Sequence, residues 1–385
     1  MKRIVCGVLA AFWVFAMILP ASASVSQEEL PEAFDIDEQL DALGKKELMQ
    51  QVPEDARELM EETGQYDLSV ENLLNLSPRG FFGALWTMFL QQLKKPLVIL
   101  ASVLGVIVLC SLLGGLQTTD GENTLSPVFS TVSVLCILTA ISAPILDCIV
   151  DTAKAIQQAS IFMLSFIPMF AAALTASGQP ITGATYNVFL FATCQVVSQV
   201  VSRTLIPLMG VYLAFCIVSP MAPNLNISSA ASTIKSLVSW ALGLIVTIFV
   251  GLLSVQTMVA QSADSVSVRT TKFLIGSFVP VVGSALSEAY TAAQGCLRLL
   301  KTSLGAYGIL VAVMTFLPIL LQTVIWYLIT NVAVIGSDIL GVSKVSMILK
   351  SCGSVLAVLL AIILCYALLI IVSTTVVILT GMGGT

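Results

Sequence analysis

The sequence predicts an all-α, polytopic membrane helix bundle that is preceded by a small acidic helical segment. Of the 385 residues, 57% are hydrophobic and only 10% are charged, and the mean hydropathy is +0.99. A soluble domain is nearer half apolar and a quarter charged. The acidic residues are clustered, since 15 of the 22 lie between Glu28 and Glu71. Several later apolar segments reach the roughly 20 residues that a helix needs to cross a bilayer.

The composition excludes several classes of function. The chain has no histidine, which removes His–Ser and His–Cys catalytic sets, imidazole metal ligands and histidine proton relays. The sequence pI of about 4.8 and the absence of basic clusters argue against nucleic-acid binding. The sequence contains no phosphate-binding loop, metal-binding constellation or paired catalytic carboxylates. We therefore expect no enzymatic activity, no cofactor, no metal and no nucleic-acid partner. The nine cysteines form no C-x-x-C pair and predict no disulfide framework.

Residues 1–23 have the order of a secretory signal peptide. Lys2 and Arg3 precede an apolar run over Ile4–Leu19, and Ala21-Ser22-Ala23 follows as a small-x-small cleavage sequence. This order predicts cleavage after Ala23. The alternative is an uncleaved first membrane helix. In either case the next segment begins outside the membrane that the chain crosses.

Residues 24–95 are expected to form an acidic helical extracytoplasmic segment. Helical patterns cover Asp37–Val52 and a short stretch that begins at Pro53 and ends before Gly64. The stretch Phe81–Lys95 is apolar and aromatic first, then rich in glutamine and lysine. This pattern is typical of an amphipathic helix at the membrane surface.

Residues 96–385 form the predicted polytopic membrane domain. Some apolar segments are short, over-long or interrupted by proline, so we expect six to nine membrane segments with some re-entrant or proline-broken. Basic residues lie at nearly every loop, so the positive-inside rule does not fix the orientation. The apolar segments are Leu97–Leu116, Pro127–Val150, Ala159–Ser177, Ala184–Ser202, Leu205–Ser219, Ser236–Val259, Phe273–Ala289, Ser303–Ala333 and Ser354–Thr380.

An internal repeat of about 112 residues is predicted within this domain. The motif S-F-x-P, followed by Ala-Leu, occurs at Ser165–Leu174 and again at Ser277–Leu286. Two further pairs follow at similar offsets, namely Thr204–Leu208 with Thr315–Ile319, and Ile234–Ser236 with Leu349–Ser351. The matches suggest repeat units at about 125–235 and 236–350, followed by a last span at 354–380. The alternative is chance similarity in an apolar chain. The motif prolines are Pro168, Pro280, Pro207 and Pro318.

A few polar residues within the apolar segments are candidates for a polar path across the membrane. Ionisable side chains at membrane depth are costly and are usually functional. The alternatives are that the charged residues lie at the membrane surface, and that the glutamines only join neighbouring helices. The candidates are Glu288, Asp147, Asp151, Arg203, Gln195 and Gln199, and Asp264 is a further acidic residue near an apolar segment.

The whole chain resembles the stage III sporulation protein AE family of endospore-forming Firmicutes. The most specific parts of this resemblance are three. Ser77-Pro78 precedes the junction FFGALWTMFLQQLKKPLVILASVLG, and the two S-F-x-P segments follow at Ser165–Leu174 and Ser277–Leu286.

The resemblance implies a subunit of the transenvelope channel between mother cell and forespore, a complex likened to a secretion apparatus. The implied location is the mother-cell membrane around the forespore, with the 24–95 segment facing the space between the membranes. The implied partners are the other products of the stage III sporulation A operon, which include ring-forming single-span proteins and a secretion-type ATPase. The forespore stage II sporulation protein Q is a further implied partner. Homo-oligomerisation stays open.

The chain is then expected to act as a conduit or as a membrane platform. An alternative is a repeat-built secondary transporter in which Glu288 or Asp147 couples ions to a solute. A further reading is a scaffold that anchors the rings of the complex.

Overall fold

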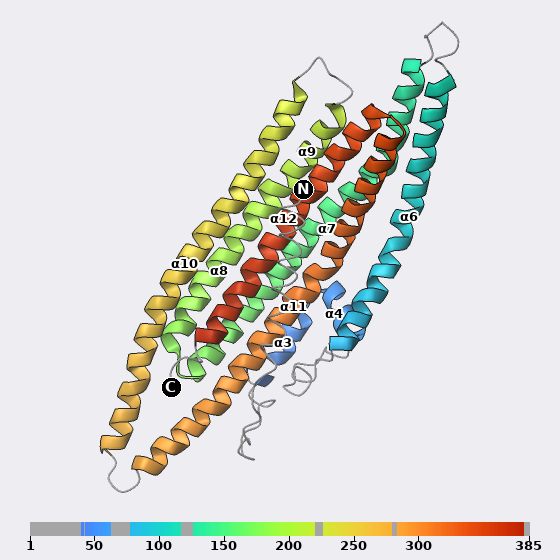
Figure 1. The fold of residues 1–385 in the computed structure, drawn as a ribbon. Helices are drawn as coiled ribbons and strands as arrows, with labels where there is room; N and C mark the ends of the chain where they lie inside the picture. Colours follow the sequence, from blue (N-terminus) through green and yellow to red (C-terminus); the bar gives the residue numbers. More distant parts are fainter. Residues whose placement is uncertain are drawn as a thin grey trace.

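The computed structural model describes residues 40–41, 43–62, 78–116, 126–219, 226–278 and 283–380. The expected signal peptide and most of the acidic segment lie outside the described residues. Six helical arms dominate the part that is described, and they run side by side in an elongated bundle (Figure 1). They are α6 (Pro78–Leu116), α7 (Ser126–Ala176), α8 (Pro180–Val200) continued by the π-helical turn η1 (Val201–Leu205) and α9 (Ile206–Val218), α10 (Ile227–Phe278), α11 (Gly283–Ile339) and α12 (Ser343–Thr380).

Each of the six arms is long and apolar enough to cross a membrane. This number is the lower end of the predicted range. The arms are much longer than one crossing requires, because the 51 residues of α7 extend over about 77 Å at 1.5 Å per residue. The hydrocarbon core of a bilayer is about 30 Å thick. The bundle therefore extends beyond a single hydrocarbon layer.

Several segments that the sequence separates are joined in the structure. Pro127–Val150 and Ala159–Ser177 both fall within α7 or its end, and α7 passes through Pro144 and Pro168 without interruption. α11 passes through Pro318 in the same way. A proline removes one backbone hydrogen bond, and neighbouring helices and local adjustments make it tolerable in a membrane helix. The prediction of proline-broken segments is therefore wrong for the described helices.

The expected re-entrant segment Leu205–Ser219 is the continuation of α8. The join is η1, a single π-helical turn that ends two residues before Pro207. The wider turn provides room where the proline ring would otherwise collide with the carbonyl group four residues earlier. Ala184–Ser202 and Leu205–Ser219 thus form one arm.

The expected boundary between the interfacial helix and the first span is also absent. Phe81–Lys95 and Leu97–Leu116 belong to one helix, α6, which includes Pro96. The interfacial position of its first part stays a prediction.

The helix order forms two successive hairpins, α7 with α8–α9 and α10 with α11. The first S-F-x-P segment, Ser165–Leu174, lies inside α7. The second begins at the end of α10 with Ser277-Phe278 and resumes in α11, while Val279 and Pro280 lie outside the described residues. The repeat therefore stays a prediction.

The core contains a column of aromatic rings on α7. Phe162, Phe166 and Phe170 stack with centroid distances of 5.7 and 5.3 Å, and Tyr186 of α8 meets Phe170 edge-on at 5.2 Å. Gly308 of α11 lies against the Phe166 ring, where any Cβ atom would collide with it. The phenylalanine of the first S-F-x-P motif thus anchors the contact of α7 with α11.

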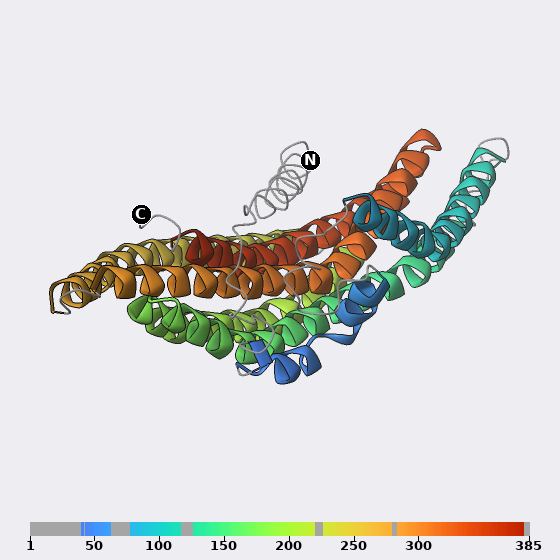
Figure 2. The same cartoon turned by 90° about the horizontal axis from the view of Figure 1, so that it is seen from below.

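Two short acidic helices, α3 (Lys45–Gln50) and α4 (Glu54–Glu62), lie against α7 and α11 (Figure 2). α4 begins directly after Pro53, as the sequence predicts. Its apolar side chains Ala56, Leu59 and Met60 are buried, whereas most of its carboxylates are exposed. The short helices are therefore amphipathic and dock by their apolar faces.

The close packing of α8 against α7 gives a direct test of the fold. A Cβ atom at Gly183 would lie 2.7 Å from the carbonyl oxygen of Ala171 and 2.7 Å from Thr175 Oγ1. We expect Gly183→Ala to destabilise the purified protein by about 1–3 kcal/mol, because a backbone atom cannot move aside. The measurement is the melting temperature in detergent.

Gly210, on the continuation of the same arm, is the matched control because a Cβ atom there would meet no other atom within 4 Å. Gly210→Ala should be neutral or stabilising by up to about 1 kcal/mol. Equal changes in melting temperature for the two variants would contradict the packing described here.

Candidate functional site

The turn between α7 and α8 has all of its backbone donors satisfied. Gly178 takes a left-handed conformation with φ of 84°. Its N–H donates to Thr175 O at 3.1 Å, and the N–H of Gln179 donates to Leu174 O at 3.0 Å. This pair of bonds is the Schellman ending of a helix. Glycine suits it because a Cβ atom disfavours the left-handed region.

The first turn of α8 is completed by a carboxylate from another helix. Asp264 of α10 accepts hydrogen bonds from the N–H of Ile181 at 3.0 Å and from the N–H of Thr182 at 2.8 Å. Pro180 has no N–H, and the N–H of Gly183 donates to Gln179 O at 2.9 Å. Asp264 is only 5% exposed. A negative charge at a helix N-terminus also interacts favourably with the helix dipole.

A basic side chain from α11 joins the same junction. Lys301 is 3% exposed, and its Nζ donates to Gln179 Oε1 at 3.1 Å. The turn of one hairpin is thereby bound to both helices of the next. We call Gln179, Ile181, Thr182, Asp264 and Lys301 the hairpin layer.

A second polar level lies farther along the bundle. Gln322 Nε2 of α11 donates to Asp151 Oδ2 of α7 at 3.2 Å, and both side chains are half-buried. Thr152 and Thr323 beside them are fully buried and donate to carbonyl groups of their own helices. We call Asp151, Thr152, Gln322 and Thr323 the Asp151 layer.

The spacing of the two layers matches a bilayer. Lys301 and Gln322 are 21 residues apart on α11, which corresponds to about 32 Å of helix. The hydrocarbon core of a membrane is about 30 Å thick. Thr182 and Arg203 on α8 and η1 are also 21 residues apart, and η1 contacts α7. The two layers are thus placed where the surfaces of one hydrocarbon layer would lie.

Two lysines of the predicted repeat bind at the opposite end of the bundle from the hairpin layer. Lys350 forms an ion pair with Asp338 at 3.0 Å, next to the α11–α12 turn. Lys235 Nζ donates to Ser354 Oγ at 2.8 Å, and Tyr212 OH donates to the same oxygen at 3.1 Å. These contacts hold the N-terminal part of α12 to α9, α10 and α11.

The residues predicted for a polar path take different positions. Asp151 is half-buried and belongs to the Asp151 layer, whereas Asp147 is exposed although it lies one turn away. Gln195 is half-buried, and Gln199 and Arg203 are exposed. The structure therefore does not bring these side chains together inside the bundle.

Glu288 lies in α11, but its side chain is outside the described residues. Its backbone is 13 residues from Lys301, on the side away from Gln322, which corresponds to about 20 Å. In the same way α10 continues for 14 residues beyond Asp264, so α10 and α11 project past the α7–α8 turn (Figure 1). Glu288 is thus outside the slab between the two layers.

Among the motif prolines, Pro168 and Pro207 are exposed and Pro318 is half-buried, while Pro280 lies outside the described residues. The sequence did not predict the roles of Asp264 and Lys301. Their partners are 83 and 122 residues away along the chain. The one available signal was that an acid and a base each adjoin the end of an apolar segment.

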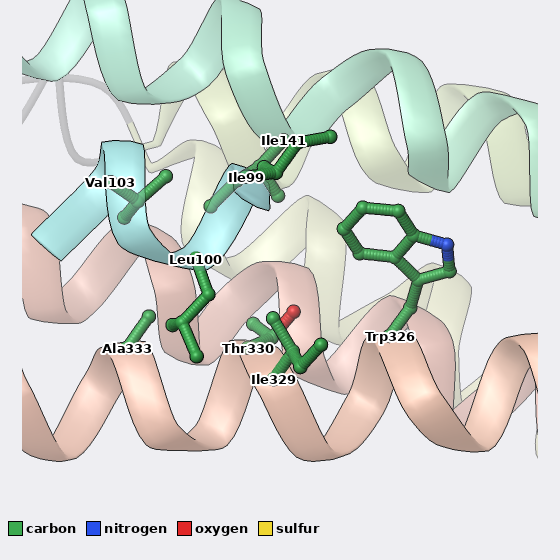
Figure 3. Close-up of a pocket in the computed structure, with 8 residues that line it drawn as sticks. All are labelled: Ile99, Leu100, Val103, Ile141, Trp326, Ile329, Thr330 and Ala333. Carbon is green, nitrogen blue, oxygen red and sulfur yellow. The ribbon is translucent and has the colours of Figure 1, made fainter. Parts of the chain in front are cut away.

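The bundle contains a small apolar pocket between α6, α7 and α11, with a volume of about 210 Å³ (Figure 3). Trp326 forms one end of it, and Thr330 is the sole hydroxyl-bearing residue of its lining. The walls suit a hydrocarbon chain and not a polar substrate. The lining residues are Ile99, Leu100, Val103, Ile141, Trp326, Ile329, Thr330 and Ala333. Within the described part of the chain, no three His, Cys, Asp or Glu side chains are grouped to hold a metal ion.

The fold and these polar layers define a multi-pass helical membrane protein. The family model of stage III sporulation protein AE matches residues 63–381, so the chain belongs to that family. A curated relative, stage III sporulation protein AE of Bacillus subtilis strain 168, is 26% identical over 240 residues. The matched region covers 62% of this chain and 60% of that relative. No solved structure matches the chain.

The hairpin layer predicts a large effect for one carboxylate. We expect Asp264→Ala to lower the free energy of unfolding by about 1.5–3 kcal/mol, because two backbone donors lose a charged acceptor in a buried setting. Thermal unfolding of the purified protein in detergent measures this loss.

Asp147→Ala is the matched control, since it removes an exposed carboxylate from a neighbouring arm. Its effect should stay within about 0.5 kcal/mol, as for most surface substitutions. An Asp264→Ala protein as stable as the Asp147→Ala protein would show that the cap is dispensable.

Proposed function

We propose that this protein is a membrane subunit of a transenvelope complex between mother cell and forespore that is needed for endospore formation. Family membership supports a role in sporulation. Six membrane-capable arms support a position within the membrane. The chain acts as a platform or as part of the wall of a conduit, and other components supply the energy.

The filled interior of the bundle is the observation that carries the platform role. Phe162, Phe166, Phe170, Tyr186 and Tyr366 are almost completely buried where α7, α8 and α12 meet. Close-packed interiors of this kind leave no room for a large solute. A conduit for large cargo is then bounded by several copies of this chain or by this chain and its partners.

The proposed location is the mother-cell membrane around the forespore. The proposed partners are the ring-forming single-span proteins and the secretion-type ATPase of the stage III sporulation A operon, together with stage II sporulation protein Q. The exposed carboxylates of α4 support an aqueous position for that helix. The segment 24–95 is then the part of the chain that meets partners between the two membranes.

A secondary transporter is the alternative, and one observation favours it. Asp264 and Lys301 are both buried in an otherwise apolar bundle, and ionisable residues at membrane depth are usually functional. Both side chains have structural partners in the hairpin layer, however, so their burial is explained without transport.

Deletion of the gene in its own organism tests the sporulation role. We expect normal vegetative growth and a loss of heat-resistant spores by orders of magnitude, restored by an ectopic copy. Microscopy should show forespores that are engulfed but then collapse or stop expressing late genes. An ordinary spore count in the deletion strain would refute the proposal.

Glu288→Gln separates the platform from the ion-coupled transporter. Since Glu288 is outside the slab between the two layers, we expect the variant to assemble and to give a normal spore count. A proton-coupled carrier that uses this carboxylate would lose its activity, because the amide cannot exchange a proton. A spore count as low as that of the deletion strain, with normal protein levels, would favour the transporter.

A further inference from the structure

A line of small polar groups runs through the bundle where α7, α8 and α12 meet. All but one of its members are less than 10% exposed, and Ser202 is half-buried with a shielded hydroxyl oxygen. We call this line the hydroxyl file. Its members are Tyr186, Cys194 and Ser198 of α8, Ser202 of η1, Ser160 of α7, and Tyr366 and Thr374 of α12.

The members lie close enough to form a continuous series. The hydroxyl of Tyr186 faces Thr374 and Cys194. The hydroxyl of Tyr366 faces Cys194, Ser198 and Ser160. Ser202 follows Ser198 after one helical turn.

The file connects the two polar layers. Tyr186 is one turn after Thr182 of the hairpin layer, and Ser202 adjoins Arg203 at the level of the Asp151 layer. The 16 residues between Tyr186 and Ser202 correspond to about 24 Å of helix. Most of the slab between the two layers is therefore crossed by polar side chains in its interior.

Three hydroxyl groups of the file have no hydrogen-bond partner in the protein. They belong to Tyr186, Tyr366 and Ser202, and the oxygen of each is shielded from solvent. Burial of a hydroxyl group without a partner is unfavourable, and buried water commonly binds such groups. A cavity of about 200 Å³ lies beside them, with Cys194, Thr193 and Tyr366 in its wall.

We propose that the hydroxyl file binds a chain of water molecules and passes protons between the hairpin layer and the Asp151 layer. Each hydroxyl group or water molecule accepts one proton and donates another. Every transfer forms one O–H bond and breaks one, so no group is consumed and no other reactant is needed. This proton path does not depend on the proposed role in sporulation.

The test uses the purified full chain in liposomes that contain the pH-sensitive dye pyranine. A potassium gradient with valinomycin makes the interior negative, and the dye reports inward proton movement. We expect the native protein to acidify the interior faster than protein-free liposomes do. Tyr366→Phe and Tyr186→Phe should each slow acidification severalfold, because phenylalanine cannot pass a proton.

Tyr327→Phe is the matched control, since Tyr327 lies on α11 outside the file. It should acidify at the native rate. The proposal is overturned if the native protein conducts no faster than protein-free liposomes, or if all three variants lose conduction equally. A protein that conducts protons but is not needed for spores would remove only the proposed function.

The melting temperature provides a second, independent measurement. If the hydroxyl of Tyr366 is dry, its removal relieves an unfavourable burial and raises the melting temperature. If the hydroxyl binds water, its removal leaves the melting temperature unchanged or lowers it. A rise for Tyr366→Phe and Tyr186→Phe relative to Tyr327→Phe would therefore contradict a hydrated file.

Discussion

The architecture depends on how the backbone donors at the start of α8 are satisfied inside an apolar bundle. In a membrane, each polar backbone group must find a partner within the protein. Pro180 removes one donor, Gln179 accepts from Gly183, and the carboxylate of Asp264 accepts the remaining two. Because that carboxylate belongs to α10, the bond fixes the position of α10 along α8. Lys301 fixes α11 to the same turn.

This fixed register determines what the helices present to each other farther along the bundle. Gly308 is seven residues beyond Lys301 on α11 and meets Phe166. Gln322, 14 residues farther on, meets Asp151. A shift of α11 by even one turn would place side chains with Cβ atoms against the Phe166 ring. Polar pinning at one level and small-residue packing at the next thus support the same alignment.

The sequence predicts the class of the protein and the number of arms better than the course of each arm. Hydropathy locates apolar segments, but it cannot show that α7 continues through Pro144 and Pro168. The continuity depends on neighbouring helices that cover the affected backbone. The start of α4 after Pro53 is predictable because a proline at a helix start acts locally.

The polar path was harder to predict, because two polar stripes lie next to each other on α8 and η1. Gln195, Gln199 and Arg203 recur every four residues, and so do Cys194, Ser198 and Ser202. Both stripes fit helical spacing, and the sequence favoured the more polar one. In the structure Gln199 and Arg203 are exposed, whereas Cys194 and Ser198 are buried. Packing against α7 and α12 decides which stripe is internal.

These features limit what can pass through a single chain. The aromatic column and the close contacts at Gly183 and Gly308 fill the bundle. The one polar line across it is a file of single hydroxyl and thiol groups, which is wide enough for water and protons. A larger cargo must therefore move outside this bundle, along a surface made with other copies or partners. The apolar faces of α6 and α10 expose many large side chains, and they are the surfaces that lipid or such neighbours would cover.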